Sequence, residues 1–380
     1  MKIAMTVMVR DEADIIAAML DHHIGQGIDT IIVTDNGSID GTTEILEDFA
    51  SRGLIELRHD PVHKKQQFTV VTQMARDAYT QFGADWVINA DADEFFIAVD
   101  PALTVADALR MTPTSIRTFT VPVTNMVGPP AASGTGLQRL IYRDLRSAEE
   151  LQNKGLMAHP TSNSIHVGDA DIEISQGNHF VSLEPDGEPP ATAAIEVLHF
   201  PSRSWQQYRN KVEISGNAYA SNPDLLPSPN HHGLRDYARL KTGILLPYYL
   251  ARHPTPGPDD VAVQRGDLIE DRRIADVIAS PEPDVELAPE AIDFDSHLFE
   301  YESRLEASRL DKSRRAAADI QRLDTENQAL MSDVAHLREK VAEYGVVVED
   351  LQIELAAYRG RRAVRLLDRA TSLLSRIRRR

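Results

Sequence analysis

One run of this sequence joins an apolar strand to three carboxylates. The strand covers Trp86–Ala90, and Asp91, Asp93 and Glu94 follow at once. A strand with so few polar residues is buried, as the strands of a parallel sheet are. Open α/β sheets bind their ligands at the carboxyl ends of such strands. The run therefore predicts a sheet with acidic oxygens at its ligand-binding edge.

Strand-like and helix-like patterns alternate along the N-terminal part of the chain. Helical spacing of apolar residues predicts helices at about 15–24, 41–50 and 66–82. Repeated β-α-β units imply a parallel sheet covered by helices. We therefore predict an α/β fold with a mostly parallel sheet and flanking helices. The expected strands are Ile3–Val9, Thr30–Thr34, Leu54–Leu57, Trp86–Ala90, Ser115–Val121 and Glu196–Phe200.

Charge and composition narrow the classes of function. The 380 residues carry a formal charge of −18, whereas proteins that bind nucleic acid need clustered Lys and Arg. The chain has no cysteine, which excludes disulfides, thiol catalysis and zinc-thiolate sites. The apolar N-terminus stops at Arg10, too soon for a secretory signal or a membrane span. We expect a cytoplasmic protein whose anionic ligands need a bound cation.

A heptad pattern runs through the C-terminal third of the chain. Its apolar positions follow alternating steps of three and four residues, with Val common at a and Leu at d. This favours a two-stranded parallel coiled coil, in which Asn327 would fix the register by pairing with its counterpart. The alternative is one long helix packed on its own domain. The heptad residues are Ile320, Leu323, Asn327, Leu330, Val334, Leu337, Val341, Tyr344, Val348, Leu351, Leu355 and Tyr358.

The residues after Tyr358 are basic and amphipathic, with eight arginines from Arg361 onward. Such a segment can rest on an anionic membrane, here the inner face of the plasma membrane, or it can be a solvated tail. A stretch rich in Pro and Asp, Pro254–Pro289, marks a boundary. We therefore expect an α/β domain at 1–250, a linker with short helices at 251–310, a parallel dimeric coiled coil at 311–360 and a basic tail at 361–380.

Asp91 and Asp93 are the first candidates for binding chemistry. Residues two apart in an extended strand point the same way, so both carboxylates would face one ligand. One could bind a hard divalent cation while the other accepts a hydrogen bond from a ribose hydroxyl or a metal-bound water. Mg²⁺ and Mn²⁺ held by few carboxylates keep positions open for phosphates. The pair alone also matches an ordinary solvated acidic loop.

A second polar loop follows the second predicted strand. Asn36 and Gly37 favour a turn with positive φ, and Ser38 or Asp40 can cap the helix that comes next. Asp35 ends the strand and lies where it can accept a hydrogen bond from an N–H group of a nucleotide base. Capping does not require that position, so Asp35 is a candidate binding residue.

Several motifs occur in order along the first 220 residues. They are Met8–Asp14 with the pair His22 and His23, then Asp35–Thr42, Asp91–Phe95, Gln176–His179, and Leu198–Ser204 followed by Lys211 and Gly216. Together they resemble family 2-type glycosyltransferases of the GT-A fold, in the bacterial branch whose acidic motif continues into Glu-Phe. One departure is Asp11, where the family more often has Asn.

The resemblance implies a nucleotide-sugar site that holds a divalent cation, Mn²⁺ or Mg²⁺. Asp91 would contact the ribose or a metal-bound water, and Asp93 would bind the metal directly. Enzymes of this fold often add a later histidine, for which His199 is the first candidate and His179 the second; a structural role for His199 is an equal alternative. Asp35 would contact a uracil-like base. The nucleotide-sugar residues carried over are Arg10, Glu12, Asp35, Asn36, Ser38 and Asp91.

An inverting transfer also needs a base beside the acceptor hydroxyl. Asp171 is preferred for this role and His179 is next. Arg203 and Lys211 could hold a phosphate or an acidic acceptor, or they could be solvated helix residues. The candidates for the base are Asp169, Asp171, Glu173 and His179.

These features predict a metal-dependent glycosyltransferase that transfers a sugar from a nucleotide sugar, with a UDP-sugar favoured, to a glycan or glycoconjugate. One rival is a non-catalytic scaffold with a vestigial domain of this fold, which the presence of Asp35, Asp91 and Asp93 argues against. The other is a nucleotidyltransferase, which should carry a Gly-rich loop with Lys or Arg near the first strand. Arg10–Glu12 is no such loop.

Overall fold

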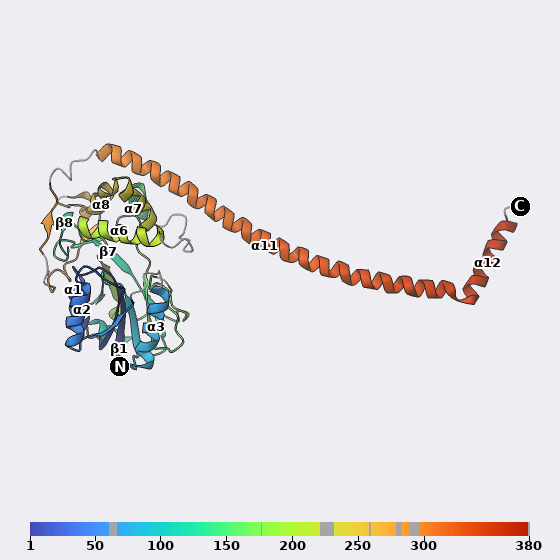
Figure 1. Cartoon of the computed structure of the whole chain (residues 1–380), viewed down its shortest axis with the longest axis horizontal. Helices are drawn as coiled ribbons and strands as arrows, with labels where there is room; N and C mark the ends of the chain where they lie inside the picture. Colours follow the sequence, from blue (N-terminus) through green and yellow to red (C-terminus); the bar gives the residue numbers. More distant parts are fainter. Residues whose placement is uncertain are drawn as a thin grey trace. The chain divides into compact units, whose positions relative to one another are not determined.

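A computed structural model describes residues 1–60, 67–175, 177–220, 232–257, 260–278, 283–288 and 296–378. The chain divides into two compact units, Met1–Leu310 and Asp311–Arg380 (Figure 1). Gln176 of the resembling motifs and the last two arginines of the basic tail lie outside the described residues.

The first unit is built on a mixed six-stranded sheet with helices on both faces. Four neighbouring strands are parallel, and β10 runs antiparallel to both β4 and β6. Helices α1 (Ile16–Gly25) and α2 (Thr42–Ser51) lie on one side of β1 and α3 (Gln67–Thr80) on the other (Figure 1). In order across the sheet, the strands are β3 (Glu56–His59), β2 (Thr30–Asp35), β1 (Ile3–Val9), β4 (Trp86–Ala90), β10 (Asn163–Val167) and β6 (Thr118–Val121).

A second sheet of five strands continues from the first through the acidic motif. The chain leaves β4, turns at Asp91–Asp93 and enters β5 (Glu94–Ala98), which pairs antiparallel with β11 (Ile195–His199). Two short strands, β8 (Ala131–Ser133) and β13 (Val285–Glu286), form a separate pair. The remaining strands of the second sheet are β7 (Val123–Val127), β9 (Tyr142–Asp144) and β12 (Leu268–Glu270), in the order β12-β9-β7-β11-β5.

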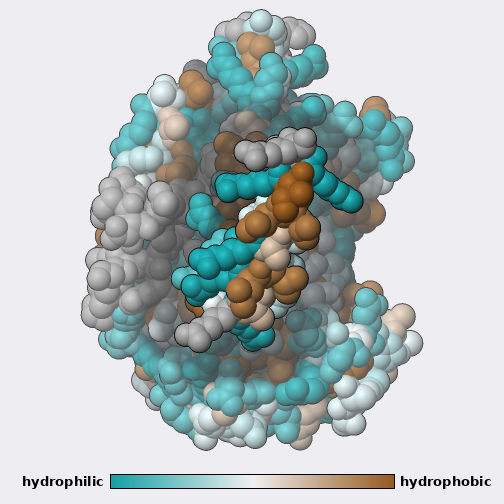
Figure 2. Space-filling model, turned by 90° about the vertical axis from the view of Figure 1, so that its right-hand side faces the viewer, coloured by the Kyte–Doolittle hydropathy of each residue, from teal (hydrophilic) through white to brown (hydrophobic). Residues whose placement is uncertain are grey.

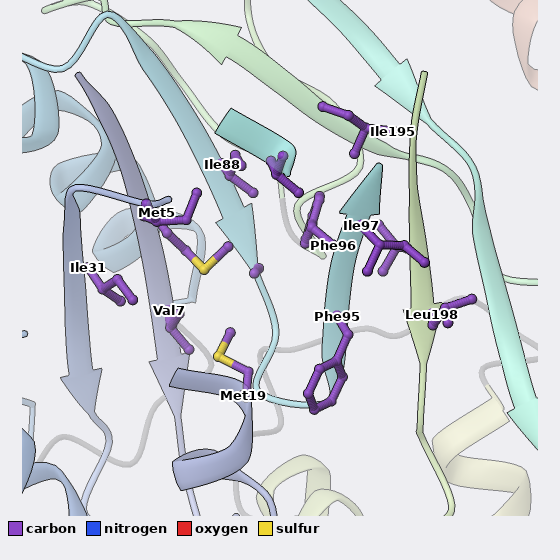
Figure 3. Close-up of a cluster of buried hydrophobic side chains, with 14 of the residues drawn as sticks. Met5, Val7, Met19, Ile31, Ile88, Phe95, Phe96, Ile97, Ile195 and Leu198 are labelled. Carbon is purple, nitrogen blue, oxygen red and sulfur yellow. The ribbon is translucent and has the colours of Figure 1, made fainter. Parts of the chain in front are cut away.

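The core joins both sheets. Figure 3 shows side chains from β1, β2 and β4 beside those of β5 and β11, with a methionine of α1 between them. Phe95 and Phe96 of β5 are fully buried in this cluster, so the strand that follows the acidic motif is anchored on both sides. The labelled members are Met5, Val7, Met19, Ile31, Ile88, Phe95, Phe96, Ile97, Ile195 and Leu198.

The asparagine inside the apolar strand β4 is part of a buried polar chain. The Oδ1 atom of Asn89 accepts a hydrogen bond from the hydroxyl of Thr6 at 2.7 Å. The Nδ2 atom of Asn89 lies 3.1 Å from Nε2 of His166, which is itself fully buried. Because these partners satisfy its amide, the asparagine is compatible with a buried central strand.

The other helices cover the remaining parts of the chain. Helix α6 packs against α7 and α8 beside β7 and β8 (Figure 1). The first turns of α11 belong to the same unit, where Phe299 contacts Tyr248 with ring centroids 5.0 Å apart. These helices are α4 (Val105–Met111), α5 (Ala148–Asn153), the 3₁₀ helix η1 (Ala191–Ala193), α6 (Trp205–Ala220), α7 (His232–Lys241), α8 (Leu245–Arg252), α9 (Val261–Gln264), α11 (Ser296–Gly360) and α12 (Arg362–Ile377).

The described residues of the second unit form two helices, the greater part of α11 and α12. Helix α11 runs through the heptad region to Gly360, and α12 follows. The heptad side chains that the structure describes are exposed, Val348 by 52% and Leu351 by 58%. None of the described helices is both long enough and apolar enough to traverse a bilayer.

The expected strands Ile3–Val9 and Trp86–Ala90 are confirmed at the same bounds, as β1 and β4. The expectation that Asp91 and Asp93, at the end of the strand, follow strand alternation is wrong. The backbone N–H of Glu94 donates to the carbonyl of Asp91 at 3.1 Å, which makes Asp91–Asp93 a turn between two sheets. Strand alternation therefore cannot set the directions of the two carboxylates. The range 251–310, expected as a linker, contributes β12 and β13 to paired strands.

Candidate active site

Three loops meet at one edge of the first sheet. They follow β1, β2 and β4, which are parallel and adjacent in the sheet, so their carboxyl ends share that edge. The loops hold Arg10–Asp14, Asn36–Gly41 and Asp91–Asp93. The sheet therefore brings together, from distant parts of the sequence, the three motifs from which a site was predicted.

Asp35, at the end of β2, organises the second loop. Its Oδ1 accepts hydrogen bonds from the N–H of Ser38 at 3.0 Å and from its hydroxyl at 2.7 Å. Its Oδ2 accepts from the hydroxyl of Thr43 at 2.6 Å. Burial of Asp35 opposes its charge, but the hydrogen bonds from Thr43 and Ser38 outweigh burial and lower its pKa. Asp35 is therefore ionised in the folded protein. The Nδ2 of Asn36 donates to the carbonyl of Asp60 at 3.0 Å.

The helix after this loop begins differently from the expectation. Gly41, not Ser38 or Asp40, is the residue before α2, and its φ of 104° is one that glycine adopts without strain. The carboxylate of Asp40 still accepts from the first helical N–H, that of Thr42, at 3.0 Å. Its other oxygen accepts from the N–H of Ala13 at 3.0 Å, so Asp40 also joins the second loop to the first.

The first loop is held against the second by its own backbone. Asp11 has a positive φ of 54°, a conformation that Asp and Asn tolerate better than most residues. Its N–H donates to the hydroxyl of Ser38 at 3.0 Å, and its Oδ1 accepts from the N–H of Ile39 at 2.7 Å. The N–H of Glu12 donates to the hydroxyl of Thr42 at 2.9 Å. Asp11, where the resembling family more often has Asn, is therefore compatible with this left-handed backbone conformation.

Arg203 lies beneath the first loop and is completely buried. Its Nε and Nη2 donate to the two carboxylate oxygens of Asp14 at 2.7 and 2.8 Å, and Nη2 also donates to Glu12. Its Nη1 donates to the carbonyl of Phe200 at 3.1 Å. Burial opposes the charge, but Glu12 and Asp14 raise the pKa of Arg203, so it stays cationic. The alternative of a solvated helix residue is therefore wrong for Arg203.

Lys211, on α6, connects the same loop to the acidic turn. Its Nζ donates to Oδ2 of Asp93 at 2.7 Å and lies 3.7 Å from Oε1 of Glu12. The side chain is 44% exposed. Lys211 is thus a partly accessible cation directly beside the carboxylate predicted to bind a metal.

The three carboxylates of the acidic turn differ in protonation. Burial raises the pKa of Asp93, but Lys211 and His199 more than compensate and hold it well below its usual range. Burial and the charge of Asp93 raise the pKa of Asp91. Burial and Asp91 raise the pKa of Glu94 to about 8. Asp93 is therefore the carboxylate that is firmly ionised at neutral pH.

Glu94 closes the turn. Its Oε2 accepts hydrogen bonds from the N–H of Asp91 at 3.0 Å and from Nδ2 of Asn163 at 2.8 Å. Both donors come from the protein, and the side chain is buried. These contacts give Glu94 a positioning role for Asp91.

The two candidate histidines lie near this turn. The Nδ1 of His199 donates to Oδ1 of Asn125 at 2.9 Å, and its Nε2 lies 3.5 Å from Oδ1 of Asp93. Burial opposes protonation of His199, but Asp93 raises its pKa. The Nδ1 of His179 donates to Oδ1 of Asn163 at 3.1 Å, and burial lowers the pKa of His179.

Asp171 lies elsewhere. Its side chain is exposed, its N–H donates to Oδ1 of Asp169 at 2.9 Å, and its carbonyl accepts from Arg76. The contacts of Asp171 are therefore outside the three loops and the acidic turn.

The donor set around Asp93 suits a divalent cation in part. One ionised carboxylate and one imidazole, from Asp93 and His199, converge, and both are ligands that Mn²⁺ accepts. Within the described ranges, no group of three or more His, Cys, Asp or Glu side chains is arranged to hold a metal ion. Two protein ligands suffice where phosphates and waters complete the shell, so the residues fit such an ion with a substrate present.

Asn178 contacts the acidic turn, and the sequence did not single it out as a site residue. It has a positive φ of 62° and is 2% exposed. Its Nδ2 donates to Oδ1 of Asp91 at 3.1 Å. Its Oδ1 is buried and has no hydrogen-bond partner among the described residues. A buried polar atom without a hydrogen-bond partner lowers the stability of the folded protein, and a bound ligand can supply the missing partner. Its place in the Gly177–His179 motif was the available signal.

An open pocket of about 780 Å³ adjoins these groups. Its lining includes Arg10 and Glu12 of the first loop, Asp40 of the second, Gly134 after β8, and Lys211 of α6. Lys211, which lines the pocket, also contacts Asp93 and so connects the pocket wall to the acidic turn. The volume is in the range of small-molecule sites.

The model of glycosyltransferase family 92 matches residues 3–125, about a third of the chain. The chain carries a glycosyltransferase family signal. The matched range contains all three loops of the candidate site. The signal supports the predicted class of enzyme, while the family 2 branch is a finer expectation that this match does not name.

Solved structures were also compared with the chain. TarS of S. aureus, residues 1–349, is 12% identical over 65% of this chain and 70% of that chain, with a TM-score of 0.33. The complex of the same TarS fragment with UDP is 11% identical over 66% of this chain and 72% of that chain, with a TM-score of 0.34. Glucosyl-3-phosphoglycerate synthase from Mycobacterium tuberculosis was solved in complex with Mn²⁺, UDP and glucosyl-3-phosphoglycerate. It is 15% identical over 44% of this chain and 56% of that chain, with a TM-score of 0.24. Scores this low do not establish a common fold. No curated protein sequence matches the chain significantly.

The backbone and the amide of Asn178 can be tested separately. Asn178→Gly keeps the left-handed backbone without the amide, whereas Asn178→Ala also strains the backbone. We expect both variants to weaken nucleotide binding by about tenfold, because the contact with Asp91 is lost, and the Ala variant to unfold at a lower temperature than the Gly variant, because alanine is strained at this positive φ. Calorimetric titration and thermal denaturation measure the two effects. Wild-type affinity in Asn178→Gly would show that only the backbone matters.

Proposed function

We propose that this protein is a metal-dependent glycosyltransferase with a GT-A fold, related to family 2 and inverting, that uses a nucleotide sugar, preferably a UDP-sugar. The observation that carries the proposal is the convergence of three loops from parallel strands beside one pocket. The family signal over residues 3–125 supports the same class of reaction. The acceptor would be a glycan or glycoconjugate.

The loops after β1 and β2 would bind the nucleotide. Asp35 is ionised and would accept a hydrogen bond from the N–H of a uracil base. Arg10 and Glu12 line the pocket, and Ser38 joins the two loops. Asn36 fixes the path of the second loop through its contact with Asp60. This division gives the base to the first two loops, and leaves the ribose and the diphosphate to the acidic turn.

Asp93 and His199 would hold Mn²⁺ or Mg²⁺, and Asp91 would contact the ribose or a metal-bound water. A bound divalent cation stabilises the negative charge that develops on a leaving nucleoside diphosphate. Lys211 supports this place for the diphosphate, because this cationic side chain lines the pocket and contacts Asp93. Asn178 would position Asp91 through its amide.

His179 is our proposed catalytic base. Burial lowers its pKa, so the imidazole is neutral at neutral pH and can accept the proton of an acceptor hydroxyl. Asp171, preferred from the sequence alone, is exposed and contacts Arg76 and Asp169. It would act only if an acceptor reached that surface.

Metal-dependent nucleotide binding tests the proposal. We expect titration with UDP to give much tighter binding in the presence of Mn²⁺, and Asp93→Asn to weaken that binding by at least about tenfold, because the firmly ionised ligand is lost. Asp48→Asn, an exposed substitution on α2, is the matched control and should bind like the wild type. An affinity for UDP that is the same with and without Mn²⁺, and the same in the wild type and Asp93→Asn, would contradict the proposed site.

We also propose that the protein is a parallel homodimer through residues 311–360. Apolar side chains at a and d positions between residues 320 and 358 are exposed, including Val334, Val341 and Val348. Helices with such a stripe associate to bury it, and an asparagine at one a position favours two strands in register. Asn327 occupies such a position.

Two valines on the same helix separate the dimer contact from general surface effects. Val348 is at an a position and is 52% exposed, whereas Val346 is two residues away on the outer side of the heptad and is 61% exposed. We expect Val348→Asp to shift the full chain toward monomer and Val346→Asp to leave the dimer intact. Sedimentation measures both. A monomeric wild type, or equal effects of the two substitutions, would overturn the coiled coil.

A further inference from the structure

Helix α12 is a separate element at the end of the chain. At Arg361 the backbone is extended, with φ −64° and ψ 134°, so the helical path of α11 stops at Gly360 before α12 begins. The guanidinium of Arg365 donates to the carbonyl of Gly360 at 2.6 and 3.0 Å, which satisfies a terminal carbonyl of α11. The chain thus ends one helix and starts another of 16 residues.

The apolar side chains of α12 share one face. Leu366, Ala370, Leu373 and Ile377 follow steps of four, three and four residues, and Leu374 adjoins them. The leucines and the isoleucine are between 61% and 67% exposed. In Figure 2, α12 faces the viewer, with brown apolar side chains gathered along one side and teal ones along the other.

The arginines of α12 form a second stripe beside the first. Arg365, Arg369 and Arg376 are separated by steps of four and seven residues, so they lie on one side of the helix; Arg378, just after α12, lies on the opposite border of the apolar face. From residue 361 to the end there are eight arginines and one acidic residue, Asp368, whereas the whole chain has a formal charge of −18. The positive charge is therefore concentrated in this segment.

The apolar face of α12 does not continue the apolar stripe of α11. The heptad of α11, continued beyond Tyr358, would place Arg365 at a d position and Arg369 and Arg376 at a positions. Charged residues at those positions do not pack in a two-stranded coiled coil. The apolar face of α12 is thus out of register with the stripe that would form the dimer.

We propose that α12 binds the surface of an anionic lipid bilayer. The leucines would enter the boundary between headgroups and acyl chains, and Arg369, Arg376 and Arg378 would contact lipid phosphates. An anionic bilayer accepts apolar and cationic side chains from one face of a helix, which is the combination that α12 presents. The rest of the chain, which is acidic, would remain in water. This proposal does not depend on the proposed reaction.

Flotation of the full chain with lipid vesicles tests the proposal. We expect binding to vesicles of phosphatidylcholine with phosphatidylglycerol, weak binding to phosphatidylcholine alone, and release at high salt, because salt screens the arginines. Arg369→Gln with Arg376→Gln, and separately Leu366→Ser with Leu373→Ser, should each reduce partitioning by at least about tenfold. Nucleotide binding should be unchanged in both variants, since they lie outside the pocket.

The matched control is Arg52→Gln with Arg110→Gln, which removes the same charge from exposed positions on α2 and α4. It should float like the wild type. Equal binding to both kinds of vesicle, equal losses in the control, or full binding by both α12 variants would overturn the assignment. Circular dichroism of each full-length variant checks that helix content is retained, so that a loss of binding reports the face and not unfolding.

Discussion

The buried guanidinium of Arg203 is the interaction on which the candidate site depends. It binds Asp14 with two hydrogen bonds, contacts Glu12 and lies 3.9 Å from Asp93. An isolated charge at a fully buried position would be unstable, so this arginine and its carboxylates must assemble together. Arg203 follows β11 and Asp14 follows β1, which means that one ion pair ties the second sheet to the loop that lines the pocket.

Charge is divided unevenly over the acidic turn, and that division suits the proposed chemistry. Asp93 stays ionised beside Lys211 and His199, while burial and mutual repulsion raise the pKa of Asp91 and Glu94. Three adjacent carboxylates can share a small buried space only in this way. The outcome is one strongly anionic side chain, Asp93, which is paired with Lys211, while Glu94 accepts a hydrogen bond from the backbone of Asp91. The metal-binding and positioning roles thus fall on different residues of one short motif.

The sequence predicted local elements well and long-range contacts poorly. Strands β1 and β4 were predicted at their observed bounds, because short apolar runs between helical patterns report burial directly. The second sheet was not predicted, since β5 pairs with β11 about a hundred residues away and no local pattern encodes that pairing. The burial of Arg203 was missed for the same reason: its partners lie 189 and 191 residues away. The positive φ of Asn178 was equally hidden.

The central claim is that the loops after β1 and β2 and the turn after β4 form a single nucleotide-sugar site. A crystal structure of the protein with UDP and Mn²⁺ tests it most directly. We expect the uracil beside Asp35, the metal ion on Asp93 and His199, and the diphosphate between that ion and Lys211. UDP bound at another surface, or bound here with the Lys211–Asp93 ion pair intact and no metal ion on Asp93, would contradict it.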